Sequence, residues 1–420
     1  MRISAPVRRL PRLPAVLRDE RQYRLLFTGQ LLSILGDRMT GVVLPFAVLA
    51  IGGGLSGVAV VSTAQFLPFA VLALPAGVWA DRLDRKRILI ASDLIRFFCQ
   101  VTAGVLLLTG TATVTHLAAL AAIYGAADAF FAPSFTGLLP RTVSPDNIQA
   151  ANAVLGVTYA TGSIVGPVLA GVLIAYAGGP GVAILFDAAT FAFSVSCLVR
   201  LHPRPAESVV AHEERPPFFT SLREGWREVR GRAWVRAFMG GLACYHVIVL
   251  PAIFVLGPVL AAREMDGARS WALITTGFGV GSMLGNFLLL RWRPTFAMRV
   301  AALMLIGASS QAVVIGSGLP PLAIGGLEVL AGICVTGAFT LWDTSLQEHI
   351  PDRALSRVSS YDYLTSVGLI PVGNIVAGLV SGAVGLRPSL IGMSIIGMTI
   401  AALVASVPAV RRLPRGATVG

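Results

Sequence analysis

Twelve long apolar runs fill this chain of 420 residues and constrain its fold more than any other feature. Each run is about 20 residues or longer, the length that an α-helix needs to cross a bilayer. A lipid core leaves backbone groups without water, so spanning segments of this kind form helices. We therefore predict an all-α integral membrane protein with transmembrane helices at about 24–51, 57–80, 88–109, 114–139, 149–177, 181–201, 234–261, 268–290, 298–317, 320–346, 356–382 and 386–408.

The composition supports a lipid environment. Hydrophobic residues make up 55% of the chain and charged residues only 13%, whereas soluble domains carry about 25% charged residues. A net charge of +12 raises the possibility of nucleic-acid binding. We exclude it because the basic residues lie in loops at one membrane face, without interleaved aromatic residues.

The distribution of basic residues predicts the topology. An even number of spans places both termini on one side of the membrane. All but five of the 33 Lys and Arg residues fall on that side, the exceptions being Arg263, Arg269 and Arg387 outside and Arg38 and Arg96 within spans. The positive-inside rule then makes both termini cytoplasmic. We expect a multi-pass protein of a bacterial cytoplasmic (inner) membrane.

The longest segment between spans lies midway along the chain, at residues 202–233. Its residues 218–229 place apolar side chains at helical spacing, as in an amphipathic helix on a membrane surface. Pro-Asp pairs before the fifth and eleventh spans favour a duplicated unit. We predict a basic N-terminus, a six-helix bundle, a linker, a second, pseudo-symmetric six-helix bundle and a tail, at 1–23, 24–201, 202–233, 234–408 and 409–420.

Charged residues inside spans are the first candidates for function, because their burial is costly. Asp37 lies deep in the first span and Asp128 deep in the fourth, with Arg96 in the third and Glu328 in the tenth. Burial penalises the charged form of a carboxylate, which would let it take up and release a proton. We therefore take these four residues as candidates for proton coupling. The alternative for Asp128 is a fixed ion pair with Arg96.

Other polar residues in or near the spans are candidates for contact with a substrate in a central cavity. Bridging of neighbouring helices is an equally good interpretation for most of them. These candidates are Arg38, Gln65, Asn152, His246 and Asn374. The four cysteines and five histidines are scattered without metal-ligand spacing. We therefore expect no metal site, no catalytic residues and no enzyme activity.

Two local sequence patterns are candidates for a role in the movement of the helices. The hairpin after the second span carries Asp81, Arg82, Arg85 and Lys86 close behind Gly77. Asp81 would accept hydrogen bonds from the start of the eleventh span and Arg85 would bind a carboxylate, so the pair would latch the halves together. The alternative is a solvated cluster that only sets topology.

The second pattern lies in the fifth span, where small residues form a thin helix edge that admits a close neighbour. The proline in this pattern removes a backbone donor and favours a bend. Ordinary small-residue packing is the alternative. The residues concerned are Gly162, Gly166, Pro167 and Gly171.

These motifs resemble those of a known family. The hairpin resembles the signature loop of the major facilitator superfamily, and the fifth-span pattern resembles the motif of its drug–proton antiporters. Two further stretches, Leu139–Asn152 and Leu222–Trp226, are similar to the subgroup with macrolide-type and siderophore exporters. The chain departs from the pattern at Asp84, where glycine is usual, and at Ala121, where many proton antiporters carry arginine.

The resemblance implies a secondary transporter that works by alternating access. We expect it to export an amphipathic drug or natural product as a monomer, driven by the proton gradient and without a cofactor. Alternatives are an importer of a polar nutrient, an exporter of siderophores or metabolites, and a sensor that no longer transports.

Overall fold

A computed structural model describes residues 15–205 and 218–414. Twelve helical segments in this part are long and apolar enough to cross a membrane. Leucines such as Leu290, Leu322 and Leu379 are more than 70% exposed on the outside of the helices, where a bilayer would cover them. The predicted all-α fold with 12 membrane-spanning helices is confirmed.

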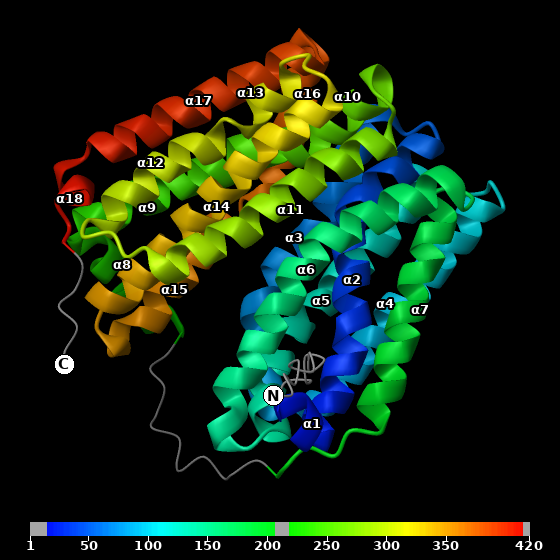
Figure 1. Cartoon of the computed structure of the whole chain (residues 1–420), viewed down its shortest axis with the longest axis horizontal. Helices are drawn as coiled ribbons and strands as arrows, with labels where there is room; N and C mark the ends of the chain where they lie inside the picture. The colour runs from blue at the N-terminus through cyan, green and yellow to red at the C-terminus, as the bar shows by residue number, and fades with distance from the viewer. Residues whose placement is uncertain (1–14, 206–217, 415–420) are drawn as a thin grey trace, which may run out of the picture.

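The first six spans are single helices that form the N-terminal bundle (Figure 1). Prolines lie inside four of these helices, where each removes a backbone donor and favours bending. The helices are α2 (Arg21–Ala50), α3 (Gly54–Arg82), α4 (Arg85–Leu108), α5 (Val114–Leu138), α6 (Ile148–Tyr176) and α7 (Pro180–Val199).

The C-terminal bundle contains the other six spans, and three of these are interrupted. The seventh comprises α9 (Ala233–Cys244), the π-helical turns η3 (Tyr245–Val249) and η4 (Ala252–Leu256), and α10 (Gly257–Glu264). The ninth is split into α12 (Ala297–Ser309) and α13 (Gln311–Gly316), and the eleventh into α15 (Asp352–Ser366) and α16 (Ile370–Val384). The continuous spans are α11 (Ala268–Arg291), α14 (Pro321–His349) and α17 (Leu386–Ser406).

The two bundles meet through equivalent helices. The fifth span, α6, packs against the eighth, α11, and the second span, α3, packs against the eleventh, α16. Within the bundles, α3 packs on α5 as α11 packs on α14. Glycine permits these close approaches, since a Cβ on Gly281 would lie 2.0 Å from the Val329 carbonyl oxygen. The contact pattern is that of two pseudo-symmetric six-helix bundles.

The two ends of the molecule differ in how closely the bundles approach. We call the end with α1 (Ala15–Asp19) and the segment after α7 the linker end. At the opposite end, Arg269 of α11 lies over the Tyr176 ring of α6, 4.5 Å from its centroid. In Figure 1 the ribbons of the two bundles lie together at the opposite end and diverge toward the linker end.

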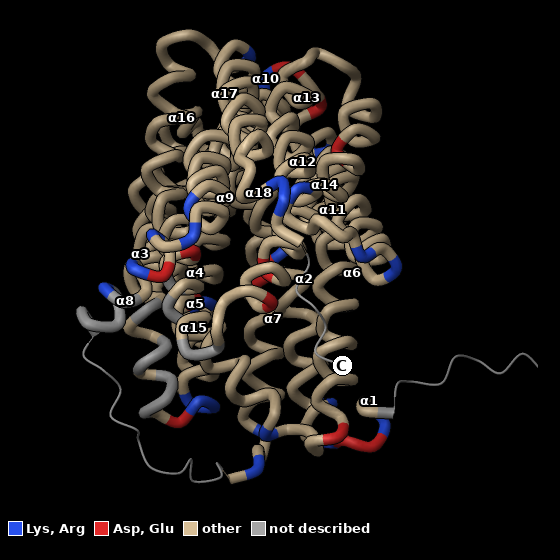
Figure 2. Tube along the Cα trace, turned by 90° about the vertical axis from the view of Figure 1, so that its left-hand side faces the viewer, with Lys and Arg blue, Asp and Glu red and all other residues tan. Residues whose placement is uncertain are grey.

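Short elements and charged residues gather at the helix ends (Figure 2). The linker helix α8 (Phe218–Gly231) packs on α15, where the rings of Trp226 and Tyr361 are 5.8 Å apart. Trp226 remains half exposed, as expected of a helix at a membrane surface. The remaining short elements are η1 (Leu139–Thr142), η2 (Pro145–Asn147) and α18 (Pro408–Arg411).

Glu20, just before α2, ties the start of the bundle to the loop between α5 and α6. Its carboxylate accepts hydrogen bonds from the Ser144 hydroxyl (2.5 Å), the Ser144 amide (2.8 Å) and Asn147 (3.1 Å). The Ser144 hydroxyl, followed by the Ser144 amide, holds the pKa of Glu20 below its ordinary value. The ionised carboxylate therefore stabilises the fold above the pKa of an unfolded glutamate, and the contribution is lost as pH falls through the lowered value.

We expect Glu20→Gln to lower the thermal unfolding temperature at neutral pH, by the equivalent of about 1–2 kcal/mol. The difference from wild type should shrink as pH falls below the ordinary glutamate pKa of about 4.3, and it should disappear only below the lowered pKa of folded Glu20. Unfolding curves recorded across this range would check the prediction. A deficit in the variant that is the same at every pH would contradict it.

Candidate functional site

Two adjoining cavities of about 310 and 270 Å³ lie between the bundles. Both are lined by Asp37 and Gly41 of α2 and, from the seventh span, by Leu250 and Phe254. They have the position and size expected of a central binding chamber. Asp37 is the one acidic residue that lines both cavities in the part of the chain that the structure describes.

A cluster of charges surrounds Arg96 of α4. Its guanidinium is fully buried and forms an ion pair with Asp93, one turn away on the same helix. The same group lies 3.2 Å from Asp128 of α5 and 3.8 Å from Asp37 of α2. Three helices thus bring three carboxylates to one cation.

The three carboxylates differ in exposure. Asp93 is fully buried and also accepts a hydrogen bond from Ser194 of α7 (2.6 Å), so it is a fixed structural partner. The side chains of Asp37 and Asp128 are 38% and 41% exposed. Tyr124 donates a hydrogen bond to Asp37 (2.8 Å). Asp37 and Asp128 are therefore the two members of the cluster whose side chains are partly exposed.

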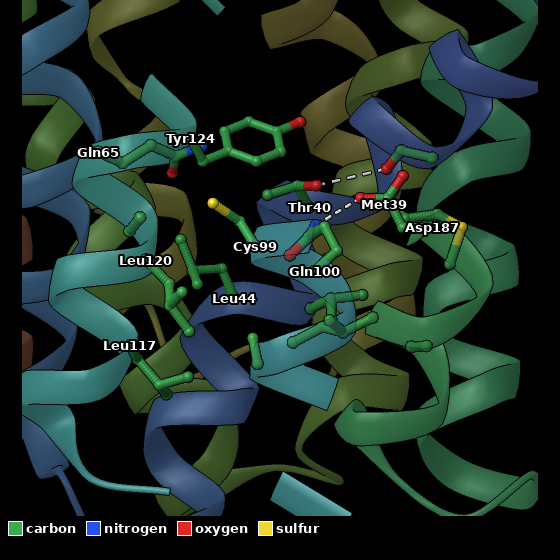
Figure 3. Close-up of a pocket in the computed structure, with 16 residues that line it drawn as sticks. Met39, Thr40, Leu44, Gln65, Cys99, Gln100, Leu117, Leu120, Tyr124 and Asp187 are labelled. Atoms are coloured by element: carbon green, nitrogen blue, oxygen red, sulfur yellow. Dashed lines mark hydrogen bonds between the residues drawn. The ribbon is translucent and has the colours of Figure 1, made fainter. Parts of the chain in front are cut away.

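A smaller pocket lies inside the N-terminal bundle (Figure 3). Gln100 of α4 and Asp187 of α7 line it and point toward each other, and Gln100 donates a hydrogen bond to the Asp187 carboxylate (2.5 Å). Its volume is about 30 Å³, enough for about one water molecule. The pocket extends to Tyr124 and is too small for a substrate.

Glu328 of α14 occupies a separate polar site in the C-terminal bundle and lines the larger cavity. Gln311, the first residue of α13, donates a hydrogen bond to Oε2 of Glu328 (2.8 Å). Tyr245, the first residue of η3, donates to Gln311 (2.9 Å). Tyr245 and Gln311, which orient Glu328, therefore lie at the interruptions of the seventh and ninth spans. Discontinuous helices of this kind form binding sites in other transporters.

Four of the five predicted cavity residues line the chamber. Arg38 and His246 line the larger cavity, while Gln65 and Asn374 line the smaller one. Arg38 lies over the Tyr159 ring, 5.7 Å from its centroid. Asn152 is exposed near the linker end of α6 and is not among the residues that line either cavity.

The small residues of α6 face two helices. A Cβ on Gly166 would lie 2.6 Å from the Arg38 Cβ, and one on Gly171 would lie 2.6 Å from the Ala272 Cβ. Gly162 also faces α2, and Pro167 lines the larger cavity. The thin edge of α6 therefore admits α2 within its own bundle and α11 across the interface.

The hairpin between α3 and α4 is described in part. Arg85 donates a hydrogen bond to the Gly137 carbonyl (2.7 Å) and Lys86 to the Val199 carbonyl (3.0 Å). Both carbonyls lie at the linker ends of helices in the N-terminal bundle. The side chains of Asp81 and Arg82, and the surroundings of Gly77, lie outside the described residues. The latch therefore stays a prediction.

Several aromatic residues of the site escaped sequence reasoning, and Tyr124 and Trp271 are two examples. Tyr124 contacts Asp37 and packs against Phe191. Trp271 is fully buried and lines the larger cavity. An aromatic residue in an apolar span carries no signal of its own, although four residues, one helical turn, separate Tyr124 from Asp128.

Twelve spanning helices in two related bundles, with a mainly apolar chamber between them that a few charged and polar side chains line, define a membrane transporter. The sequence model of the Major Facilitator Superfamily matches residues 26–371, and the chain belongs to that family.

Two named relatives of this chain are an efflux pump and an exporter. The chain is 25% identical over 410 residues to the multidrug efflux pump Tap of Mycolicibacterium fortuitum, a match that covers 93% of this chain and 96% of the relative. It is 28% identical over 360 residues to the enterobactin exporter EntS of Escherichia coli, with 82% of each chain covered.

Solved structures share the fold at lower identity. A bacterial homologue of the iron transporter ferroportin, in an inward-facing state, superposes with a TM-score of 0.71 at 16% identity, covering 92% of this chain and 99% of that one. A bacterial homologue of the lysosomal transporter Spinster, inward-facing and occupied, gives 0.69 at 15% identity, covering 94% and 99%. At this identity the likeness shows the fold alone.

Proposed function

We propose that this protein is a proton-coupled exporter of amphipathic small molecules that works by alternating access in a bacterial cytoplasmic membrane. The exporters among its relatives support the direction of transport, because their names describe efflux of multiple drugs and export of enterobactin. A large chamber with predominantly apolar walls supports an amphipathic cargo.

The observation that carries proton coupling is the excess of carboxylates around Arg96. Three aspartates share one guanidinium, so the cluster is negative when all three are ionised. Protonation of Asp37 or Asp128, the two with partly exposed side chains, would relieve this repulsion. Asp37 also borders the chamber, so its charge would bias the balance between the two open states.

The arrangement of the bundles and the arginine distribution support an orientation. The segment between the bundles would be cytoplasmic, and this conformation would open to the cytoplasm. The bundles would span 24–201 and 234–408, and one chain would suffice for transport. Arg85 and Lys86 would take part in a cytoplasmic latch with Asp81.

Proton coupling predicts that Asp37→Asn and Asp128→Asn each reduce gradient-driven transport by tenfold or more. An asparagine keeps the shape of the side chain but cannot carry a proton. Purified protein in liposomes, with an imposed pH gradient and a fluorescent lipophilic drug, would report both transport and its direction. Accumulation in the direction opposite to export would favour the importer.

Asp146→Asn provides a matched control, because Asp146 is an exposed aspartate of the same bundle. It should transport like wild type. Proton coupling at the cluster would be refuted if both cluster variants kept wild-type transport and its dependence on the gradient.

A further inference from the structure

The wall that the C-terminal bundle contributes to the larger cavity holds two buried polar atoms that remain unsatisfied. They are Oε1 of Glu328 and Nε1 of Trp271, neither of which has a hydrogen-bond partner among the described residues. Glu328 is 2% exposed and Trp271 is fully buried. A buried polar group without a partner is costly, so a partner from outside the chain is expected when the site is occupied.

The carboxylate of Glu328 is held in one orientation. Gln311 donates to Oε2, and Tyr245 fixes Gln311 in turn. Oε1 is therefore left as the free acceptor beside the cavity. The ring of Trp271 is also fixed, since its far edge packs against the backbone of Gly257.

The charged residues that line the cavity favour one sign of charge on the ligand. No Lys or Arg pairs with Glu328 in the part of the chain that the structure describes, and Arg38, on the other wall, lies over Tyr159. Asp37 adds a second carboxylate to the lining. Arg38 and Asp37 have opposite charges and together add no net charge to the lining, so Glu328 decides the sign. Beside Glu328 an anionic group would meet a like charge in a site of low dielectric, whereas a cation would supply the missing counter-charge.

The remaining walls suit a cation with an apolar body. The rings of Phe254, Phe278 and Phe339 line the same cavity. Aromatic faces attract an ammonium group and bury apolar surface. The N–H of Trp271 would donate to an oxygen on the same ligand.

We propose that Glu328 and Trp271 form a subsite for the protonated amine of an amphipathic cation that also carries a hydrogen-bond acceptor. The subsite deepens the proposed export function and rests on it, because it names the class of cargo. It also separates this chain from an exporter of anionic siderophores.

Three probes that share the fluorescent pyrene ring system but differ in charge test the charge preference. They are pyrenylmethylammonium (cationic), pyrenylmethanol (neutral) and pyrenecarboxylate (anionic). Binding to the purified full chain in nanodiscs, without a gradient, should favour the ammonium over both others by about tenfold, which corresponds to about 1.4 kcal/mol. Glu328→Gln should abolish this preference. Glu264→Gln, which changes a glutamate paired with Arg387 at the opposite end, should keep it.

Equal binding of the three probes to wild type would overturn the proposal, as would a preference that survives in Glu328→Gln. The wild-type order of affinities tests the proposal even if that variant fails to fold. Trp271→Phe loses the N–H but keeps an aromatic ring, and it should keep the preference for the ammonium probe, because that probe carries no acceptor for the N–H. Because binding is measured without a gradient, the binding result does not depend on proton coupling. The ammonium probe can bind preferentially even if transport is not proton-coupled, and transport can be proton-coupled even if the three probes bind equally.

Discussion

Replacing Arg96 with leucine is expected to destabilise the N-terminal bundle by about 3–5 kcal/mol. The variant would leave Asp93 as a fully buried carboxylate without a cation, although Ser194 would still donate to it. The Arg96 guanidinium also lies over the rings of Phe131 and Phe191, 4.2 and 4.6 Å from their centroids, and these contacts would be lost. A fall in the unfolding temperature of purified protein would measure the effect.

The double variant Asp93→Asn with Arg96→Leu separates charge from packing. The asparagine removes the uncompensated charge and can keep a hydrogen bond to Ser194, so the double variant should regain part of the lost stability. Asp37 and Asp128 contribute less to the loss, because each is partly exposed and can stay hydrated. An unfolding temperature of Arg96→Leu equal to that of wild type would contradict the structural role of the pair.

The sequence predicts the Arg96 cluster only in part. Asp93 lies three residues before Arg96, a spacing at which two side chains on one helix can pair. Asp37 and Asp128 come from other helices, and depth along a span does not define which face of a helix a residue occupies. Their convergence on Arg96 depends on how α2, α4 and α5 are rotated, which tertiary packing decides.

The breaks in the C-terminal bundle were also beyond sequence reasoning. Hydropathy defines twelve runs, and all twelve are helical, because long apolar segments must satisfy their backbone in lipid. Hydropathy does not report a local change of helical pitch, such as a π-helical turn. Pro251, between the two π-helical turns, and Ser310, between α12 and α13, stand at two of the breaks. Proline and serine also occur inside unbroken spans, so neither residue defines a break alone.

The proposed proton site and the proposed cargo site lie in different bundles but border one chamber. Asp37 belongs to α2, whose next residue, Arg38, packs against Gly166 of α6. The helix α6 in turn packs on α11, which carries Trp271. A change of charge at Asp37 therefore acts next to the helix pair that must separate when the chamber opens at the opposite end. This contact makes the α6–α11 interface a place to test alternating access directly.

Gly279→Ala is expected to shift the protein away from the conformation described here and to reduce transport by tenfold or more. A Cβ on Gly279 of α11 would lie 2.2 Å from the Ser163 carbonyl oxygen of α6. The obstacle is backbone, so the two helices must separate by roughly 1 Å to reach ordinary van der Waals contact. Even 1.4 kcal/mol of strain changes the ratio of two conformations tenfold.

Hydrogen–deuterium exchange in nanodiscs would detect this shift without any label. The variant should exchange faster in the opposite-end loops at 177–179 and 265–267, and more slowly near the linker end, because closing one end accompanies opening the other. Gly326→Ala is the matched control, since a Cβ there meets nothing within 4 Å. If both variants exchanged and transported alike, the α6–α11 contact would not limit the cycle, and the seal at the opposite end would have to rest on other contacts, such as Arg269 with Tyr176.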